Sequence, residues 1–164
     1  MSKIDYKIVL EKMVKKIFEA EIIDGGLVVD DRGAVRFVND FNFKTVKRFY
    51  QVENFSKEVV RAFHGHRHEE KYAYVIRGSA ILCVVPLKSI KKPSKKAKVQ
   101  RFILSSKKPQ ILYIPSGHAN GFRFLEDNSV IIFFSTSTLE ESKSDDYRYP
   151  YDYWGRKIWE IENR

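Results

Sequence analysis

Short runs of β-branched and aromatic residues, separated by turn residues, dominate the chain from Leu27 onward. Nine such runs are predicted to be strands: 27–29, 35–38, 47–52, 59–63, 72–76, 80–86, 99–104, 110–114 and 130–134. No helical pattern separates them, and each strand must bury one face against a second sheet or the far wall of a barrel. The pattern therefore predicts an all-β sandwich or barrel.

The two ends of the chain have different patterns. Apolar residues between Ile8 and Phe18 recur near the helical period, which predicts a short helix within an N-terminal extension of about residues 1–22. A tail of about residues 145–164 is rich in Tyr and Trp and is expected to pack on the barrel or on a second subunit. No repeat or linker is visible, so residues 1–164 are predicted to form one domain.

Composition narrows the class of protein. A chain of 164 residues with 43% hydrophobic and 14% aromatic residues is a folded chain, not a disordered one. The longest apolar run, at 130–134, is far shorter than the roughly 20 residues that span a bilayer, so no membrane association is expected. The single cysteine, Cys83, cannot form an internal disulfide, and a cytoplasmic location is expected.

Basic residues outnumber acidic ones by 30 to 21, which favours a partner that carries negative charge. A dense basic cluster is interrupted by Pro93 and Ser94 and comprises Lys88, Lys91, Lys92, Lys95, Lys96, Lys98 and Arg101. It has no base-stacking aromatic residues and no recognition helix, so we interpret it as a solvated loop and expect no nucleic-acid partner. The net charge of +9 also fits anionic lipid or a phosphorylated small molecule as the acidic partner.

Two segments hold the candidate chemistry. In the first, His64 and His66 alternate along a predicted strand end and therefore point to one face, where they can serve a metal ion or a proton transfer. In the second, a Pro-Ser-Gly turn at residues 115–117 is expected to aim His118, Asn120 and Phe122 at the mouth of a cavity. Together they have the two-motif layout of the cupin barrel, a double-sheet jelly roll in which both motifs line one cavity.

From about residue 30 to residue 134 the sequence resembles the cupins that act on nucleotide-linked keto-sugars. These include dTDP-4-dehydrorhamnose 3,5-epimerase and the dTDP-sugar 3,4-ketoisomerases. The resemblance implies a nucleotide-diphosphate 4-keto-6-deoxy sugar as substrate, a metal-free reaction and no cofactor.

The resemblance also implies roles for individual residues. Arg32, in the Asp-Asp-Arg-Gly motif, is expected to contact the nucleotide diphosphate. A segment that contains Asn54 and Arg61 is similar to the epimerase segment that ends in the catalytic base, so His64 takes that role. Lys71 matches the lysine beside the sugar ring. The segment 115–122, with the expected substrate contacts His118, Asn120 and Phe122, is similar to the epimerase turn.

A tyrosine with paired histidines, here Tyr50 with His64 and His66, is closer to the ketoisomerases. Other positions depart from the epimerase pattern. Phe133 stands near the place of its catalytic tyrosine, Asn120 replaces a histidine, and the aspartate partner of the base is expected to be absent because the chain stops at Arg164. The residues expected to hold the thymine ring fall near Val35 and Phe37, so the nucleotide need not be dTDP.

Removal of a proton beside a ketone requires a base of near-neutral pKa and a cation or hydrogen-bond donor at the developing enolate oxygen. His64 or His66 can act as the base, and Lys71 or Tyr113 as the donor. Tyr50 or Tyr113 can supply the second proton. The predicted activity is therefore epimerisation, with 3,4-ketoisomerisation as the alternative.

Two other readings stay open. A metal-dependent cupin could use His64, His66, Glu70 and His118, although the usual fourth ligand position is Asn120, a poor ligand, and no metal is predicted. The second is a noncatalytic sugar-binding cupin that has lost its catalytic acid. Phe133, near the place of the catalytic tyrosine, supports it. A homodimer is expected because a sheet of eight or nine strands has edges that a second copy would protect.

Overall fold

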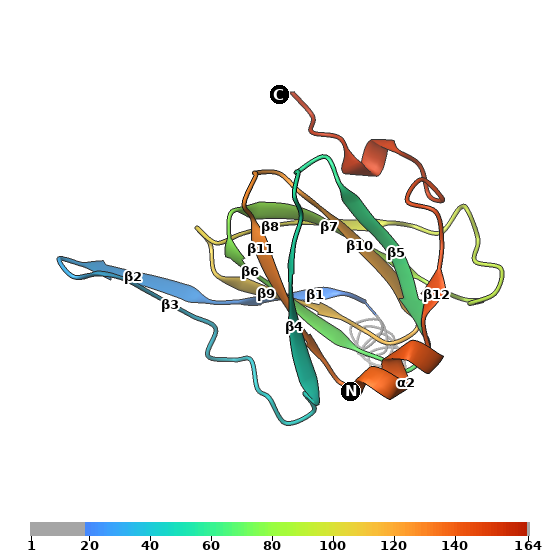
Figure 1. The fold of residues 1–164 in the computed structure, drawn as a ribbon, viewed down its shortest axis with the longest axis horizontal. Coiled ribbons are helices and arrows are strands. Elements are labelled where there is room, and N and C mark those ends of the chain that lie inside the picture. Colours follow the sequence, from blue (N-terminus) through green and yellow to red (C-terminus); the bar gives the residue numbers. More distant parts are fainter. Residues whose placement is uncertain (1–18, 164) are drawn as a thin grey trace, which may run out of the picture.

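The structure is a computed structural model that describes residues 19–163, and it contains two antiparallel five-stranded sheets (Figure 1). The first sheet has the order β1 (Glu21–Asp24), β9 (Gln110–Ile114), β6 (Lys71–Arg77), β11 (Val130–Ser135) and β4 (Arg48–Glu53). The second has the order β12 (Tyr147–Arg148), β5 (Val60–His66), β10 (His118–Phe124), β7 (Ser79–Pro86) and β8 (Gln100–Ser105). The predicted all-β, double-sheet architecture is confirmed.

All nine predicted strands are present, and three strands were missed. Because β1 begins at Glu21, the predicted helical extension does not reach residue 22. The helix predicted between Ile8 and Phe18 lies outside the described residues. β10 occupies residues that were expected to form a turn. The turn is confined to residues 115–117, where Gly117 adopts a positive φ of 69°, and the chain then pairs with both β5 and β7.

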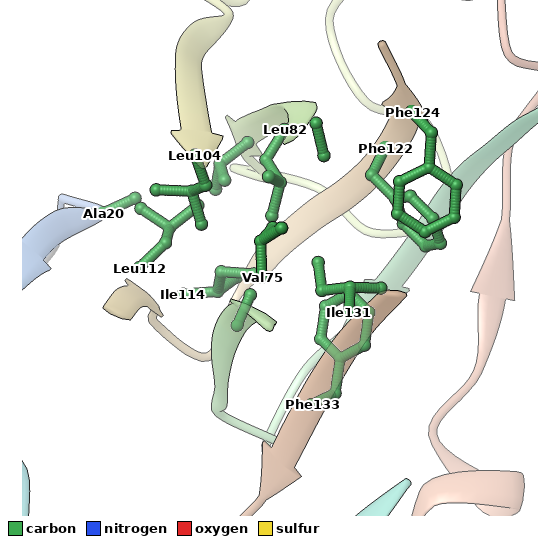
Figure 2. Close-up of a cluster of buried hydrophobic side chains, with 13 residues drawn as sticks. Ala20, Val75, Leu82, Leu104, Leu112, Ile114, Phe122, Phe124, Ile131 and Phe133 are labelled. Atoms are coloured by element: carbon green, nitrogen blue, oxygen red, sulfur yellow. The ribbon is translucent and has the colours of Figure 1, made fainter. Parts of the chain in front are cut away.

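The main core lies between the two sheets (Figure 2). Its central side chains, such as Leu82, Leu112 and Ile131, are completely removed from solvent. They come from alternate positions of β7, β9 and β11, as the period of two in a strand requires. Toward one end of this core, Phe122 and Phe133 form the wall of a pocket.

A second apolar cluster covers the outer face of the second sheet. Trp154 and Trp159 from the C-terminal tail pack on Phe63 of β5, and the rings of Phe63 and Trp154 meet edge to face at 4.7 Å. The expectation that the aromatic tail packs on the barrel is confirmed. The helix α2 (Leu139–Ser144) precedes the tail, and the tail contains the 3₁₀ helix η1 (Lys157–Trp159).

A two-stranded ribbon, β2 (Gly26–Asp30) and β3 (Gly33–Phe37), projects from the barrel (Figure 1). Its apolar side chains are exposed; Val28 and Val35, which face each other across the ribbon, are 56% and 65% exposed. Within the described part of the chain, no helix has the length and apolar character needed to cross a bilayer.

Candidate active site

A pocket of about 170 Å³ opens between the two sheets. It is lined by Tyr50 and Val52 of β4, Arg61 and His64 of β5, Lys71 of β6, Asn120 and Phe122 of β10, and Phe133 of β11. The structure thus brings together six of the residues singled out from the sequence: Tyr50, Arg61, His64, Lys71, Asn120 and Phe122. All of them belong to strands, so the backbone ladders fix their positions.

His64 is held by a carboxylate that the sequence analysis expected to be missing. Its Nδ1 lies 3.0 Å from Oδ1 of Asp146, which follows α2 and precedes β12. Burial raises the pKa of Asp146, but hydrogen bonds from His64 and Arg148 outweigh it, and the net pKa is lowered. An ionised carboxylate only accepts, so Nδ1 of His64 carries the hydrogen. In the neutral ring, Nε2 is then the nitrogen that can take up a proton. This corrects the expectation of a missing aspartate.

A β-bulge sets the side chains of β5. Asn120 pairs with His64 and Phe122 pairs with Arg61, so one residue of β10 lies opposite two residues of β5. The extra residue turns Arg61 to the same face as His64, although simple alternation places them on opposite faces. The amide of Asn120 also donates to the carbonyl of His64 at 3.1 Å, which ties the bulge to the pocket.

His66 points to the interior like His64, but both of its ring nitrogens are engaged. Nδ1 lies 2.8 Å from the carbonyl oxygen of Asp145 and 3.0 Å from Oε2 of Glu69, and Nε2 lies 2.8 Å from Nζ of Lys71. Burial, followed by the charge of Lys71, lowers the pKa of His66. A neutral imidazole that donates through Nδ1 accepts from the ammonium through Nε2. His66 therefore positions Lys71, which corrects the expectation that it can act as the base.

Lys71 is buried beside the pocket, and burial lowers its pKa. Glu69 opposes this effect, because its carboxylate lies 3.8 Å from Nζ. Glu69 itself is completely buried and accepts hydrogen bonds from Arg48, Ser135 and Ser142 at 3.2, 2.6 and 2.8 Å. Paired in this way, the buried ammonium and carboxylate can coexist in a site where either charge alone would be costly.

The sequence analysis missed Asp145, Asp146 and Glu69. The carboxylate of Asp145 accepts the backbone N–H groups of residues 67–69, so it holds the turn between β5 and β6. Burial raises the pKa of Asp145, and these backbone hydrogen bonds reverse the effect and lower it. For Asp145 and Asp146, the one available signal in the sequence was an acidic pair at the start of an aromatic tail. The sequence gives no signal for Glu69, because acidic residues usually face solvent.

Tyr50 and Phe133 form the opposite wall of the pocket. Their rings are stacked, with centroids 5.4 Å apart and an interplanar angle of 19°. Burial, followed by the negative charge of Glu69, raises the pKa of Tyr50, so its hydroxyl keeps the proton at neutral pH. Arg48 lies over the same ring at 4.9 Å. The pocket therefore has a histidine on one sheet and a proton-bearing tyrosine on the other.

Other residues singled out from the sequence lie elsewhere. Tyr113 is paired with Tyr72 on the outer face of the first sheet, where its hydroxyl donates to Glu70 at 2.8 Å, so it is not the donor in this pocket. His118 is buried at the start of β10 with Nδ1 2.9 Å from the carbonyl of Ser116, and it does not line the pocket. Asn54 accepts from Arg61 at 2.7 Å and thus braces a pocket residue.

Arg32 was expected to contact the diphosphate, but it lies at the tip of the β2–β3 ribbon, 85% exposed and paired with Asp30. It does not line the pocket. The set proposed for a metal ion, His64, His66, Glu70 and His118, is not gathered either. Among residues 19–163 no three His, Cys, Asp or Glu side chains are grouped to hold a metal ion.

Residues 15–151 match the family model of dTDP-4-dehydrorhamnose 3,5-epimerase. The match covers most of the chain, which therefore belongs to this family of dTDP-sugar isomerases. A curated relative, the spore coat polysaccharide biosynthesis protein SpsL of Bacillus subtilis, is 28% identical over 95 residues, which are 57% of this chain and 62% of that protein. The chain thus matches less than two thirds of the length of that relative.

Solved structures of low sequence identity share the fold. The epimerase of Bacillus anthracis, with TDP and pyrophosphate bound, has a TM-score of 0.68 at 19% identity, covering 82% of this chain and 80% of its own. The rmlC epimerase of Mycobacterium tuberculosis has a TM-score of 0.66 at 20% identity, and the match covers 79% of this chain and 68% of the epimerase. QdtA, a 3,4-ketoisomerase of Thermoanaerobacterium thermosaccharolyticum, has a TM-score of 0.64 at 16% identity, and the match covers 84% of this chain and 93% of QdtA. These likenesses confirm the cupin jelly roll.

The environment of His66 predicts how stability depends on pH. Its pKa in the folded chain lies below the ordinary 6.5, because of burial and Lys71, and Glu69 and Asp145 only partly offset this. Below about pH 6.5 the unfolded chain binds a proton that the folded chain does not, so the free energy of unfolding decreases as pH falls. We expect a decrease of up to about 1.4 kcal/mol per pH unit.

Urea denaturation at about pH 7.5 and about pH 5.5 measures this decrease. It should shrink in His66→Gln and persist in His68→Gln, since His68 is exposed. An equal decrease in the two variants would show that the ring of His66 is not held neutral.

Proposed function

We propose that this protein is a nucleotide-sugar epimerase that acts on a nucleotide-diphosphate 4-keto-6-deoxy sugar. The observation that carries the proposal is the His64–Asp146 pair, at 3.0 Å, in a pocket that also holds Lys71 and, on the other sheet, Tyr50. Family membership supports the substrate class. A related ketoisomerase structure contains TDP-4-keto-6-deoxyglucose, and the epimerase ChmJ of Streptomyces bikiniensis contains dTDP-quinovose.

In the proposed reaction, Nε2 of His64 removes the proton from the carbon beside the ketone. The C–H electron pair forms the enolate, and its negative charge develops on the ketone oxygen. Asp146 remains ionised and stabilises the imidazolium that forms, and it holds the ring in the tautomer with the free Nε2. The ammonium of Lys71, fixed by His66, neutralises the enolate oxygen.

Epimerisation requires that the new proton arrive from the face opposite to the base. Tyr50 is suited to this step because it lies on β4, across the pocket from β5, and keeps its proton at neutral pH. Arg48 lies over the ring of Tyr50 and can stabilise the phenolate that forms there. The cycle closes when His64 releases its proton to solvent and the Tyr50 phenolate takes one up. Phe133 supplies a flat apolar support for the tyrosine ring.

A second candidate is 3,4-ketoisomerisation, in which the new proton goes to the neighbouring carbon. The position of the hydroxyl favours it: of the two stacked rings that line this wall, Tyr50 carries the hydroxyl and Phe133 has none. A tyrosine with paired histidines is the ketoisomerase pattern. Against it, Nε2 of His66 accepts from Lys71, so the second histidine is not available for proton transfer. The product distinguishes the two reactions.

The pocket also bears on the assembly. Ligand pockets usually enclose about 300 to 1,000 Å³, and the 170 Å³ found here suits a sugar ring without its nucleotide. The exposed apolar β2–β3 ribbon projects away from the barrel (Figure 1). Arg32 lies at the tip of this ribbon. We therefore place the ribbon against a second copy of the chain, where burial of its valines stabilises a homodimer and Arg32 reaches the diphosphate.

The role of His64 is tested with solvent deuterium. With the correct keto-sugar, NMR should show exchange at the carbon beside the ketone, and His64→Asn should slow it by about 10² to 10⁴ while TDP binding is retained. The matched control His68→Asn, at an exposed histidine, should exchange at the wild-type rate. No exchange with any dTDP, UDP, GDP or CDP keto-sugar would leave a noncatalytic sugar-binding protein as the better account.

The role of Tyr50 is separable from that of His64. In Tyr50→Phe, His64 can still remove the proton and return it to the same face, so deuterium exchange should continue. Formation of the inverted sugar should fall by about 10² to 10⁴. Tyr74→Phe, on the outer face of β6, is the control and should change neither rate. Exchange and inversion lost to the same extent would contradict a role for Tyr50 in the second step alone, and a 3-keto product would identify the ketoisomerase.

The homodimer predicts a particle of twice the 19.3 kDa chain mass in light scattering. The double variant Val28→Glu, Val35→Lys keeps an attractive pair across the ribbon but puts charges where burial is expected, so it should yield monomers with weaker TDP binding. Phe55→Glu with Ile161→Lys, at two other exposed apolar residues, should remain dimeric. A wild-type particle of 19.3 kDa at micromolar concentration would refute the dimer.

A further inference from the structure

The excess of positive over negative charge in this protein lies in one segment. Residues 87–108 contain nine Lys and Arg side chains and no Asp or Glu. Because the whole chain has 30 basic and 21 acidic residues, the rest of the chain is balanced at 21 of each. The net charge of +9 is therefore a property of the loop between β7 and β8, of β8 itself and of the turn that follows β8.

Hydrogen bonds from the C-terminal tail hold the loop between β7 and β8 in a defined conformation. Three aromatic side chains of the C-terminal tail donate hydrogen bonds to its carbonyls: Tyr149 to Ile90, Tyr153 to Pro93 at 2.9 Å, and Trp154 to Ser94 at 2.9 Å. Ile90 and Pro93 are buried. A chain of like charges extends by self-repulsion unless other contacts hold it, and here the tail does so.

With the backbone of the loop held inward, its cations face solvent. The exposed side chains are Lys88, Lys91, Lys92, Lys95, Lys96 and Lys98. At the base of the loop, a cavity of about 400 Å³ is lined by Arg67, Lys88, Ser89 and Lys91, among others. It offers cationic and hydroxyl groups to one anionic head group.

The chemistry of this surface selects among anionic partners. Eight of its nine cations are lysines, which attract as point charges and lack the planar fork that arginine uses for specific phosphate or base contacts. The single arginine, Arg101, donates to the carbonyls of Ile158 and Glu160. The aromatic rings at the loop are packed against one another and point their polar atoms into it, so they are not available to stack on bases.

We propose that this basic surface binds the anionic face of a lipid bilayer. The proposal replaces the expectation from the sequence of a solvated loop and no membrane association. Clusters of four to eight basic residues bind such surfaces. In Figure 1 the loop and the β2–β3 ribbon lie at opposite ends of the longest axis of the molecule, so a second copy on the ribbon leaves the loop exposed. No residue of the basic segment lines the active-site pocket, so the proposal is independent of the reaction.

The test is co-sedimentation of the full chain with vesicles. Phosphatidylcholine vesicles that contain about one third phosphatidylglycerol should bind the protein at low salt and release it as salt screens the charges, and pure phosphatidylcholine should not bind it. The variant Lys91→Gln, Lys92→Gln, Lys95→Gln, Lys96→Gln should bind at least about tenfold more weakly.

The matched control removes four other exposed lysines: Lys44→Gln, Lys57→Gln, Lys143→Gln, Lys157→Gln. It has the same net charge as the loop variant and should bind like the wild type, and deuterium exchange on the keto-sugar should be normal in both variants. Equal weakening in the two variants, or equal binding to both kinds of vesicle, would overturn the proposal. Binding to single-stranded DNA without binding to anionic vesicles would overturn it in favour of a nucleic-acid partner.

Discussion

Pairing of β12 with β5 brings two consecutive aspartates from the C-terminal segment against the two histidines of the site. Asp146 holds His64 by its carboxylate, and the backbone carbonyl of Asp145 holds His66. The carboxylate of Asp145 also fixes the turn that leads to Lys71. The orientation of the proposed base, the tautomer of its neighbour and the place of the proposed enolate donor thus depend on one short strand contact. The aromatic tail that follows β12 packs on the outer face of the same sheet and secures that contact.

The charges of the site are arranged so that neighbouring groups differ in protonation. His66 stays neutral because it is buried beside Lys71, and Tyr50 keeps its proton because it is buried near Glu69. Buried charges are tolerated only when they are paired and hydrogen-bonded, and Glu69 links Arg48, His66 and Lys71 into one such network. A base on one sheet and an acid on the other is the arrangement that inversion at carbon requires.

Runs of β-branched and aromatic residues were sufficient to predict an all-β sandwich or barrel and the positions of nine strands. The double sheet and the shared cavity of the two motifs were predicted from the likeness to the cupins. Position along the chain could not reveal the extra residue in β5, which turns Arg61 toward His64, because a bulge depends on the partner strand. Nor could it show that Tyr113 faces outward, since that depends on the register of β9 with β6. Asp146 was missed because it lies 82 residues from His64, and only tertiary packing brings the two together.

The central claim is that a sugar ring lies between His64 and Tyr50 with its ketone at Lys71. A crystal structure of the His64→Asn variant with a bound nucleotide-diphosphate 4-keto-6-deoxy sugar tests this most directly. The account predicts that the side chain at position 64 lies within about 3.5 Å of the carbon beside the ketone, with the Tyr50 hydroxyl over the opposite face and Lys71 at the ketone oxygen. A sugar bound outside this pocket, or with residue 64 and Tyr50 on the same face of the ring, would contradict it.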